Sequence, residues 1–284
     1  MSRNENRTGC KHLDENISSV EQCNEEEKQQ EPKVSMNLAV MTEIVDLPSK
    51  GRFYNENHPL FNKETVSIKY LTAHEEDILN NRAFLRKGIA IDKMLQSVIL
   101  DKSVKLDDLL ICDKDAIVIS ARITGYGEEY LTKIQCPECG ETNDYQFDLS
   151  KIKIFYGDLD KFNENKNVVI QLPKTKSIVE CKLRTGVDEK EMAFLTEKKK
   201  KNNLPEAIVT DQLKQIIVSI NGNSDRGFIN NFVNNMPMID SRFLRNEYQR
   251  LIPNIDLTQL YLCPFCTVES EVQVPIGPSF FWSK

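Results

Sequence analysis

The chain has 284 residues, 40% of them hydrophobic, and its 37 lysines and arginines against 43 aspartates and glutamates give a formal net charge of −6. This length can bury a sizeable core in one large or two small domains, whereas the acidic balance disfavours general binding to nucleic acids or anionic membranes. No run of about 18 apolar residues occurs and the N-terminus lacks an apolar centre, so a transmembrane helix and a secretory signal are both excluded, which favours a cytoplasmic protein.

Residues 1–38 are expected to form a disordered, acidic tail. They are rich in Glu, Asn, Gln, Ser and Lys, and the few apolar residues among them cannot offset the entropy lost on ordering. A segment that folds only onto a partner is the alternative. Cys10 and Cys23 fall in this tail and are expected to be free thiols, whereas Cys112 and Cys181 lie in apolar contexts and are expected in the core.

A β-hairpin and a capped helix are expected to open the folded part of the chain. Apolar residues lead through 41–47 into the turn Pro48–Gly51, and apolar and polar residues then alternate over 66–70, which predicts strand, turn and strand. Thr72 and Glu75 have the spacing of a capping box, so a helix is expected to begin there. The acids of its first turn are favoured by the helix dipole, so we interpret them as cap residues rather than catalytic carboxylates.

Three helices and a second hairpin follow. Apolar residues spaced three and four apart predict helices over 89–100, 106–110 and 116–123. Strand-like segments then approach Cys136 and leave Cys139, which predicts a hairpin with this cysteine pair at its tip.

The second half of the chain repeats this order. A hairpin over 168–183 precedes a helix capped by Thr185, an apolar helix over 213–220, and a shorter and a longer helix in which Asp240 matches Asp115. A final hairpin carries the second cysteine pair. The offset between matching positions rises smoothly, from 113 residues at the threonine caps to 127 residues at the cysteine pairs, as a duplication with small insertions requires. Coincidence between two ordinary α+β stretches is the alternative.

The sequence therefore predicts an α+β protein of two tandem repeats, in residues 39–165 and 166–284. Each repeat is expected to have an N-terminal β-hairpin, several helices and a C-terminal β-hairpin that ends in a CPxC zinc knuckle. One zinc ion bound by four cysteines is expected to join the two halves.

The candidate metal ligands are the four cysteines of the two CPxC pairs, Cys136, Cys139, Cys263 and Cys266. Two thiolates separated by two residues can bind one Zn²⁺ ion, and two such pairs supply the complete tetrahedral shell of a structural site. A dithiol redox motif has the same spacing, but neither pair is predicted to open a helix. Buried free thiols, or two separate incomplete sites, would also fit the spacing. Thr267 stands where the first pair has Gly140, which makes the second turn harder to form.

Catalysis has little support in the sequence. None of the three histidines has an evident nucleophile as partner, and no phosphate-binding glycine loop occurs. The lysine run 198–201 is interpreted as a solvated helix end, favoured by the helix dipole, rather than as a contact to nucleic acid.

Seven short motifs in 46–149 form a recognisable set. In chain order they are Leu47–Gly51 with Tyr54, Leu71–Leu79, Leu85–Gly88, Asp92–Leu95, Asp107–Leu110, Asp113–Ala116 and Cys136–Gly140. In this order they resemble the T-even-type bacteriophage baseplate protein family, whose members are described as baseplate hub subunits or hub assembly chaperones. The resemblance is looser in the second half of the chain and does not include the tail.

The resemblance implies a non-enzymatic component of a contractile tail, with other baseplate hub or tape-measure proteins as partners and no small-molecule substrate. Its implied location is the host cytoplasm during assembly and, for a protein that stays in the particle, the tail baseplate of the virion. The candidates for its binding surface are Lys50, Arg86, Lys87 and Asp92, with a local cap or ion pair as the alternative for each. A zinc-ribbon regulator that binds nucleic acid is the competing hypothesis, which the acidic residues around the knuckles disfavour.

Overall fold

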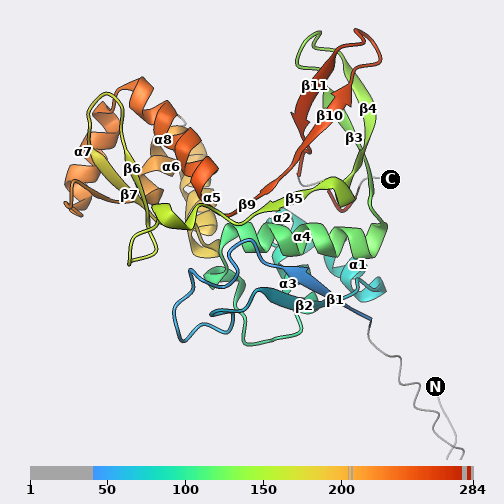
Figure 1. Ribbon diagram of the computed structural model, residues 1–284. Coiled ribbons are helices and arrows are strands. Elements are labelled where there is room, and N and C mark those ends of the chain that lie inside the picture. Colours follow the sequence, from blue (N-terminus) through green and yellow to red (C-terminus); the bar gives the residue numbers. More distant parts are fainter. Residues whose placement is uncertain (1–40, 204, 206, 277–279, 283–284) are drawn as a thin grey trace, which may run out of the picture. The chain divides into compact units, whose positions relative to one another are not determined.

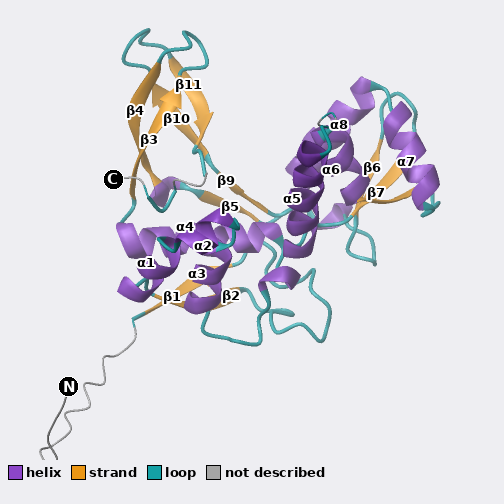
Figure 2. Cartoon of the chain, turned by 180° about the vertical axis from the view of Figure 1, so that it is seen from behind, coloured by secondary structure: helices purple, strands orange, loops and turns teal. Residues whose placement is uncertain are grey.

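The computed structural model describes residues 41–203, 205, 207–276 and 280–282, and the statements below concern these residues. The tail predicted over 1–38 lies outside them. The described chain combines helices with small antiparallel sheets, which confirms the α+β class (Figure 1; Figure 2). None of the described helices is long and apolar enough to cross a membrane.

The first group of elements follows the order predicted for 39–165. It consists of β1 (Thr42–Asp46), β2 (Thr65–Lys69), α1 (Ala73–Leu79), α2 (Arg82–Arg86), α3 (Ala90–Val98), the 3-10 helix η1 (Leu106–Asp108), α4 (Ile111–Tyr126), β3 (Glu129–Gln135) and β4 (Thr142–Asp148). β1 pairs antiparallel with β2, and β3 with β4. The alternation in β2 buries Val66 and Ile68 and leaves the residues between and before them exposed, so the sheet has one core face.

The second group has a similar order with an additional strand. It consists of β6 (Val168–Gln171), β7 (Ile178–Cys181), α5 (Gly186–Lys201), α6 (Ile208–Ile216), β8 (Ile217–Ile220), α7 (Arg226–Asn235), α8 (Met238–Leu251), β10 (Thr258–Leu262) and β11 (Glu269–Gln273). Short elements connect the groups: η2 (Leu149–Lys151), β5 (Lys153–Phe155), η3 (Leu159–Lys161) and β9 (Asn254–Asp256). β5 pairs antiparallel with β9 and so links a segment that follows the first group to one near the end of the second.

The prediction of one helix over 213–220 is wrong for the second half of that segment. α6 ends at Ile216, and the residues after it form β8, which pairs with β7. Apolar residues three and four apart fit a helix, but this run of β-branched residues also fits a strand, and the open edge of β7 decides in favour of the strand. In the first group, the residue after α3 forms no strand like β8. Ile99 instead makes one isolated antiparallel β-bridge to Ile68 of β2.

The two predicted capping boxes are confirmed, and each includes a lysine from the preceding hairpin. The carboxylate of Glu75 accepts hydrogen bonds from the Thr72 backbone N–H (3.0 Å) and hydroxyl (2.6 Å), and Lys69 Nζ lies 2.7 Å from it. The same three roles in the second group belong to Thr185, Asp188 and Lys182. The first turns of α1 and α5 are therefore held to their hairpins by the same arrangement of side chains.

Replacing Glu75 by glutamine is expected to destabilise the fold by about 3 kcal/mol at pH 7. Burial raises the pKa of Glu75, but hydrogen bonds from Lys69, Ser97 and Thr72 outweigh this and lower it from 4.5 to about 2. A carboxylate whose pKa falls on folding stabilises the protein above its unfolded pKa, and this contribution disappears as the pH falls toward the folded value. Urea unfolding should therefore give a constant difference between the two proteins from pH 7 to about 5.5 that shrinks below about pH 4.5. A difference that grows on acidification would contradict this account.

A buried aspartate in the first turn of α4 and another in the first turn of α8 each hold the turn of the hairpin in their own group. Asp113 of α4 accepts hydrogen bonds from the Ser49 backbone N–H (3.0 Å), the Ser49 hydroxyl (2.5 Å) and the Tyr54 hydroxyl (2.7 Å). Asp240 of α8 accepts from two backbone N–H groups in the β6–β7 turn, at 2.7 and 3.0 Å. In these contacts Asp240 resembles Asp113, whereas the sequence matched it with Asp115, which lies two residues further along α4.

Two hydrophobic cores are present among the described residues. The first collects buried side chains from β1 to β4, α1, α3 and α4, and it also includes Tyr261, Cys263 and Val274 from the β10–β11 hairpin and its end. The second collects side chains from β6, β7, β8, α6, α7 and α8. The last hairpin of the chain thus packs with the elements of the first group.

Helix α5 approaches the first group very closely at its N-terminus. The backbone N–H of Gly186 donates to the carbonyl of Leu109 at 2.9 Å. A Cβ atom at Gly186 would lie only 2.3 Å from the carbonyl oxygen of Leu106. This junction therefore requires glycine, because any side chain would collide with backbone atoms.

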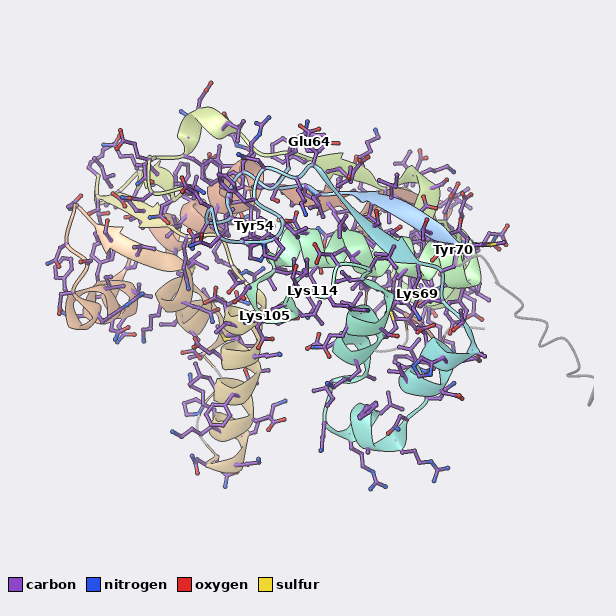
Figure 3. The ribbon with its side chains drawn as sticks, turned by 90° about the horizontal axis from the view of Figure 1, so that it is seen from below. Tyr54, Glu64, Lys69, Tyr70, Lys105 and Lys114 are labelled. Carbon is purple, nitrogen blue, oxygen red and sulfur yellow. The ribbon has the colours of Figure 1, made fainter. Side chains whose placement is uncertain are left out.

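An ion-pair network surrounds the same junction. Lys114 of α4, labelled in Figure 3, lies 2.8 Å from Asp92 of α3 and 2.6 Å from Glu189 of α5. Burial lowers the pKa of Lys114, but its hydrogen bonds to Asp92 and Glu189 outweigh this and raise it. Lys190 of α5 pairs with Asp107 of η1 and lies 3.8 Å from Asp92. Charged groups from both halves of the chain thus neutralise one another where the halves meet.

Candidate metal centre

The two knuckle hairpins, β3–β4 and β10–β11, lie side by side (Figure 1; Figure 2). The Tyr145 hydroxyl donates to the Leu260 carbonyl at 3.2 Å, and the Tyr261 hydroxyl donates to the side-chain oxygen of Asn143 at 2.5 Å. The rings of Tyr145 and Tyr261 meet edge to face, with centroids 4.9 Å apart. Hydrogen bonds and aromatic contacts therefore fix one hairpin against the other.

This packing brings all four predicted cysteines together. The Sγ atoms of Cys136 and Cys266 are 3.8 Å apart, those of Cys139 and Cys263 are 3.7 Å apart, and all four lie within 4.8 Å of one another. A zinc ion with four Zn–S bonds of about 2.3 Å requires sulfur separations of about 3.8 Å. The four sulfurs therefore lie at metal-binding distance, with each hairpin supplying two of them.

The turns of the two knuckles have the same hydrogen bonds. In each, the N–H of the first cysteine donates to the carbonyl five residues later, at 2.8 Å in the first knuckle and 3.1 Å in the second. The residue after the second cysteine donates to the carbonyl of the first cysteine, at 3.0 Å in both. That residue has φ 78° at Gly140 and φ 58° at Thr267. Thr267 thus adopts the left-handed conformation that glycine takes in the first knuckle, although it is β-branched.

Replacing Thr267 by glycine is expected to stabilise the protein by about 1 kcal/mol, because a β-branched residue at positive φ is strained. Part of the gain is offset by the lost hydrogen bond from the Thr267 hydroxyl to the Cys266 carbonyl, 2.7 Å long. The reverse change, Gly140→Thr, should destabilise the first knuckle by a similar amount. Thermal unfolding of the metal-loaded variants measures both effects, and a lower melting temperature for Thr267→Gly would contradict the prediction.

Neighbouring groups shift the pKa values of Cys263 and Cys139 in opposite directions. Burial raises the pKa of Cys263, but hydrogen bonds beginning with that from the backbone N–H of Cys266 outweigh it and lower the pKa to about 6. The backbone N–H of Glu141 lowers the pKa of Cys139, but desolvation and the neighbouring thiols outweigh this and raise it. A bound Zn²⁺ ion would hold its cysteine ligands as thiolates, because the thiolate is the form that coordinates a metal.

The surface around the knuckles is acidic, as the sequence indicated. One lysine, Lys133, is exposed on β3, whereas the exposed acidic residues are Glu128, Glu129, Glu138, Glu141, Asp144, Glu269 and Glu271. Such a surface repels phosphate groups and disfavours a nucleic-acid contact at the hairpins.

The polar residues proposed for a binding surface divide into two kinds. Lys50 lies 3.9 Å from Glu64 and 4.5 Å from the centre of the Tyr156 ring, and Asp92 belongs to the Lys114 network, so both have local partners. Arg86 and Lys87 are exposed at the end of α2. The structure therefore leaves Arg86 and Lys87 accessible and gives Lys50 and Asp92 local contacts.

A cleft between α4 and the connection from α8 to β9 was not anticipated from the sequence. Its volume is about 610 Å³, and Asp115, Arg184 and Arg250 are among the residues that line it. Asp115 is exposed, and desolvation and the nearby charge of Glu189 raise its pKa against the opposing effects of Lys114 and Arg184. The walls come from segments that are far apart in the chain, and no motif or spacing connects them.

Comparison with known protein families identifies the chain's relatives. A family model described as T4 bacteriophage base plate protein matches residues 40–282, which include both groups of elements and both knuckles. A search of curated proteins and a search of solved structures found no match. The chain belongs to the T4 bacteriophage base plate protein family.

Proposed function

We propose that this baseplate protein is a component of the central hub of a contractile tail or a factor that assembles that hub. The observation that carries the proposal is the family match over 40–282, together with the resemblance of the motifs in 46–149 to hub subunits and hub assembly chaperones. It acts in the host cytoplasm while the baseplate is assembled, and a copy retained in the particle would lie in the tail baseplate. Its partners are other hub proteins or the tape-measure protein.

We propose further that one zinc ion is bound by Cys136, Cys139, Cys263 and Cys266. The sulfur separations of 3.7 and 3.8 Å support zinc, because they equal the edge of a tetrahedral four-sulfur site. The ion would have no open position for a substrate, so its role would be to join the two hairpins. A closed four-thiolate site stabilises a fold and does not activate water.

We propose that the chain arose by tandem duplication, with repeats in 39–165 and 166–284. Three arrangements that occur once in each half support this: the capping box with its lysine, the buried aspartate below the hairpin turn, and the CPxC knuckle. The aspartates Asp113 and Asp240 are separated by the same 127 positions as the first cysteines of the knuckles. Each aspartate accepts a backbone N–H in the turn of its own hairpin, and arrangements that recur in the same order in both halves are unexpected from chance similarity.

The buried carboxylates support a protein that binds rather than catalyses. Glu75 and Asp188 cap helices, and Asp113 and Asp240 hold hairpin turns, so each is used by the fold. His58, one of the histidines considered for catalysis, stacks on the ring of Tyr54 with a centroid distance of 4.1 Å. These groups have structural partners and are not arranged around a reacting atom.

Co-expression with each hub, tape-measure and other baseplate protein of the same phage, followed by affinity purification, tests the proposed function. We expect a hub or tape-measure protein to be retained at physiological salt. A chain that retains none of them, yet shifts DNA or RNA in a gel at that salt, would instead be the zinc-ribbon regulator.

A further inference from the structure

The outer faces of the two knuckle hairpins differ in chemistry although their backbones match. Counted from the first cysteine of each knuckle, four positions in the first hairpin are polar: Lys133, Gln135, Glu138 and Glu141. The same four positions in the second hairpin are apolar: Leu260, Leu262, Phe265 and Val268. All eight residues are exposed. We call the four residues of the second hairpin the apolar stripe.

The apolar stripe brings four exposed apolar side chains together on one hairpin. Leu260, Leu262 and Phe265 are 61%, 59% and 60% exposed, and Val268 is 43% exposed. The first three positions follow the outward-facing side of β10 to the tip of the knuckle, while Tyr261 between them is buried. Neighbouring apolar side chains that remain in water mark a contact surface more often than single exposed ones do.

The fold itself does not require the apolar stripe. The first hairpin makes the same knuckle turn and the same strand pairing with polar side chains at these positions. The buried contacts between the hairpins come from the opposite face, through Tyr145 and Tyr261. The apolar side chains of the second hairpin therefore reduce solubility without contributing to the packing between the hairpins.

Glutamates border the apolar stripe. In the register of the hairpin, Leu260 is opposite Glu271 and Leu262 is opposite Glu269, and both glutamates are exposed. A partner would need apolar side chains for the stripe and positive charges for its border. A second copy of this chain fits poorly, because a symmetric contact between two stripes would bring the glutamates of both copies together.

We propose that the apolar stripe is the docking surface for a polypeptide segment that combines apolar side chains with lysine or arginine. This inference rests on the proposed function, since the segment would belong to another baseplate protein. The second hairpin is held against the first by hydrogen bonds and by the proposed zinc ion. A surface fixed in this way loses little conformational entropy on binding.

The duplicated hairpin provides the test variant. Leu260→Lys, Leu262→Gln, Phe265→Glu and Val268→Glu together give the second hairpin the side chains that the first already tolerates. We expect this variant to keep the melting temperature and metal content of the unaltered chain, and to lose at least tenfold in affinity for the baseplate protein that the unaltered chain retains. Met238→Gln with Ile239→Gln is the matched control, because these residues of α8 are 85% and 60% exposed and lie outside the stripe.

A second variant tests the charge of the partner. Glu269→Lys with Glu271→Lys should weaken the same complex, and the unaltered complex should weaken as salt is added. A four-residue variant that binds as tightly as the unaltered chain would overturn the docking surface and leave the proposed function intact. Retention of no baseplate protein by the unaltered chain would overturn both. A dimer of the unaltered chain in sedimentation that the four-residue variant cannot form would assign the stripe to self-association instead.

Discussion

Replacing both cysteines of either knuckle by serine is expected to abolish binding of the proposed zinc ion and to lower the melting temperature by at least about 10 °C. A structural zinc site is worth on the order of 10 kcal/mol, comparable to the whole stability of a domain. Each hairpin supplies two of the four sulfurs, so neither pair alone completes the shell. The loss should extend beyond the hairpins, because Cys136 and Cys263 also pack in the first core.

Metal analysis and thermal unfolding of three variants test this expectation. Cys136→Ser with Cys139→Ser and Cys263→Ser with Cys266→Ser should give the same loss of zinc. Cys10→Ser with Cys23→Ser removes two thiols outside the described residues and should keep one zinc per chain. A full equivalent of firmly bound zinc in either knuckle variant would exclude a shared site.

Replacing Gly186 by alanine is expected to cost about 3 kcal/mol or more, the upper range for added volume in a packed site. The new Cβ would lie 2.3 Å from the Leu106 carbonyl oxygen and 3.1 Å from the Asp107 Cα, and backbone atoms cannot rotate away as a flexible side chain can. α5 would have to move away from η1. This shift would also lengthen the contacts of Lys114 with Glu189 and of Lys190 with Asp107.

Gly227→Ala in the first turn of α7 is the matched control. Its Cβ would meet only the Asp225 carboxylate at 3.1 Å, and alanine is the better helix former, so we expect little change or a small gain in stability. A double-mutant cycle adds a second readout. Glu189→Gln should cost less in the Gly186→Ala background than in the unaltered chain, because the two positions share one junction. Equal costs in both backgrounds would show that α5 has not moved.

Much of the fold could be predicted from local patterns, and the exceptions have identifiable causes. The capping boxes at Thr72 and Thr185 depend on residues three positions apart, which a sequence displays directly. β8 depends on the open edge of β7, which local spacing does not reveal. The assignment of Asp113 rather than Asp115 depends on which face of α4 meets the turn, and two residues along a helix change that face by more than half a turn.

The cysteine cluster could be predicted because two CPxC pairs and a repeated order of elements each constrain it. The two hairpins are far apart along the chain, but the repeated order of elements in the sequence predicted that they would pack together. Leu260, Leu262, Phe265 and Val268 were equally visible in the sequence, but only the strand register with Glu269 and Glu271 and the exposure of the side chains in the structure distinguish them from core residues. The cleft at Asp115 had no signal in the sequence, because its lining depends on how α4 meets the α8–β9 segment.

The separation of the two knuckles along the chain sets an order of events during synthesis. The first cysteine of the second knuckle follows that of the first by 127 positions. A ribosome that adds about 5 to 20 residues per second needs about 6 to 25 s to cover that distance. For this time Cys136 and Cys139 have no partner pair, and half a shell holds zinc weakly. Capture of the proposed zinc ion would therefore wait for the last hairpin, so the ion would distinguish finished molecules from nascent chains that stop before Cys263.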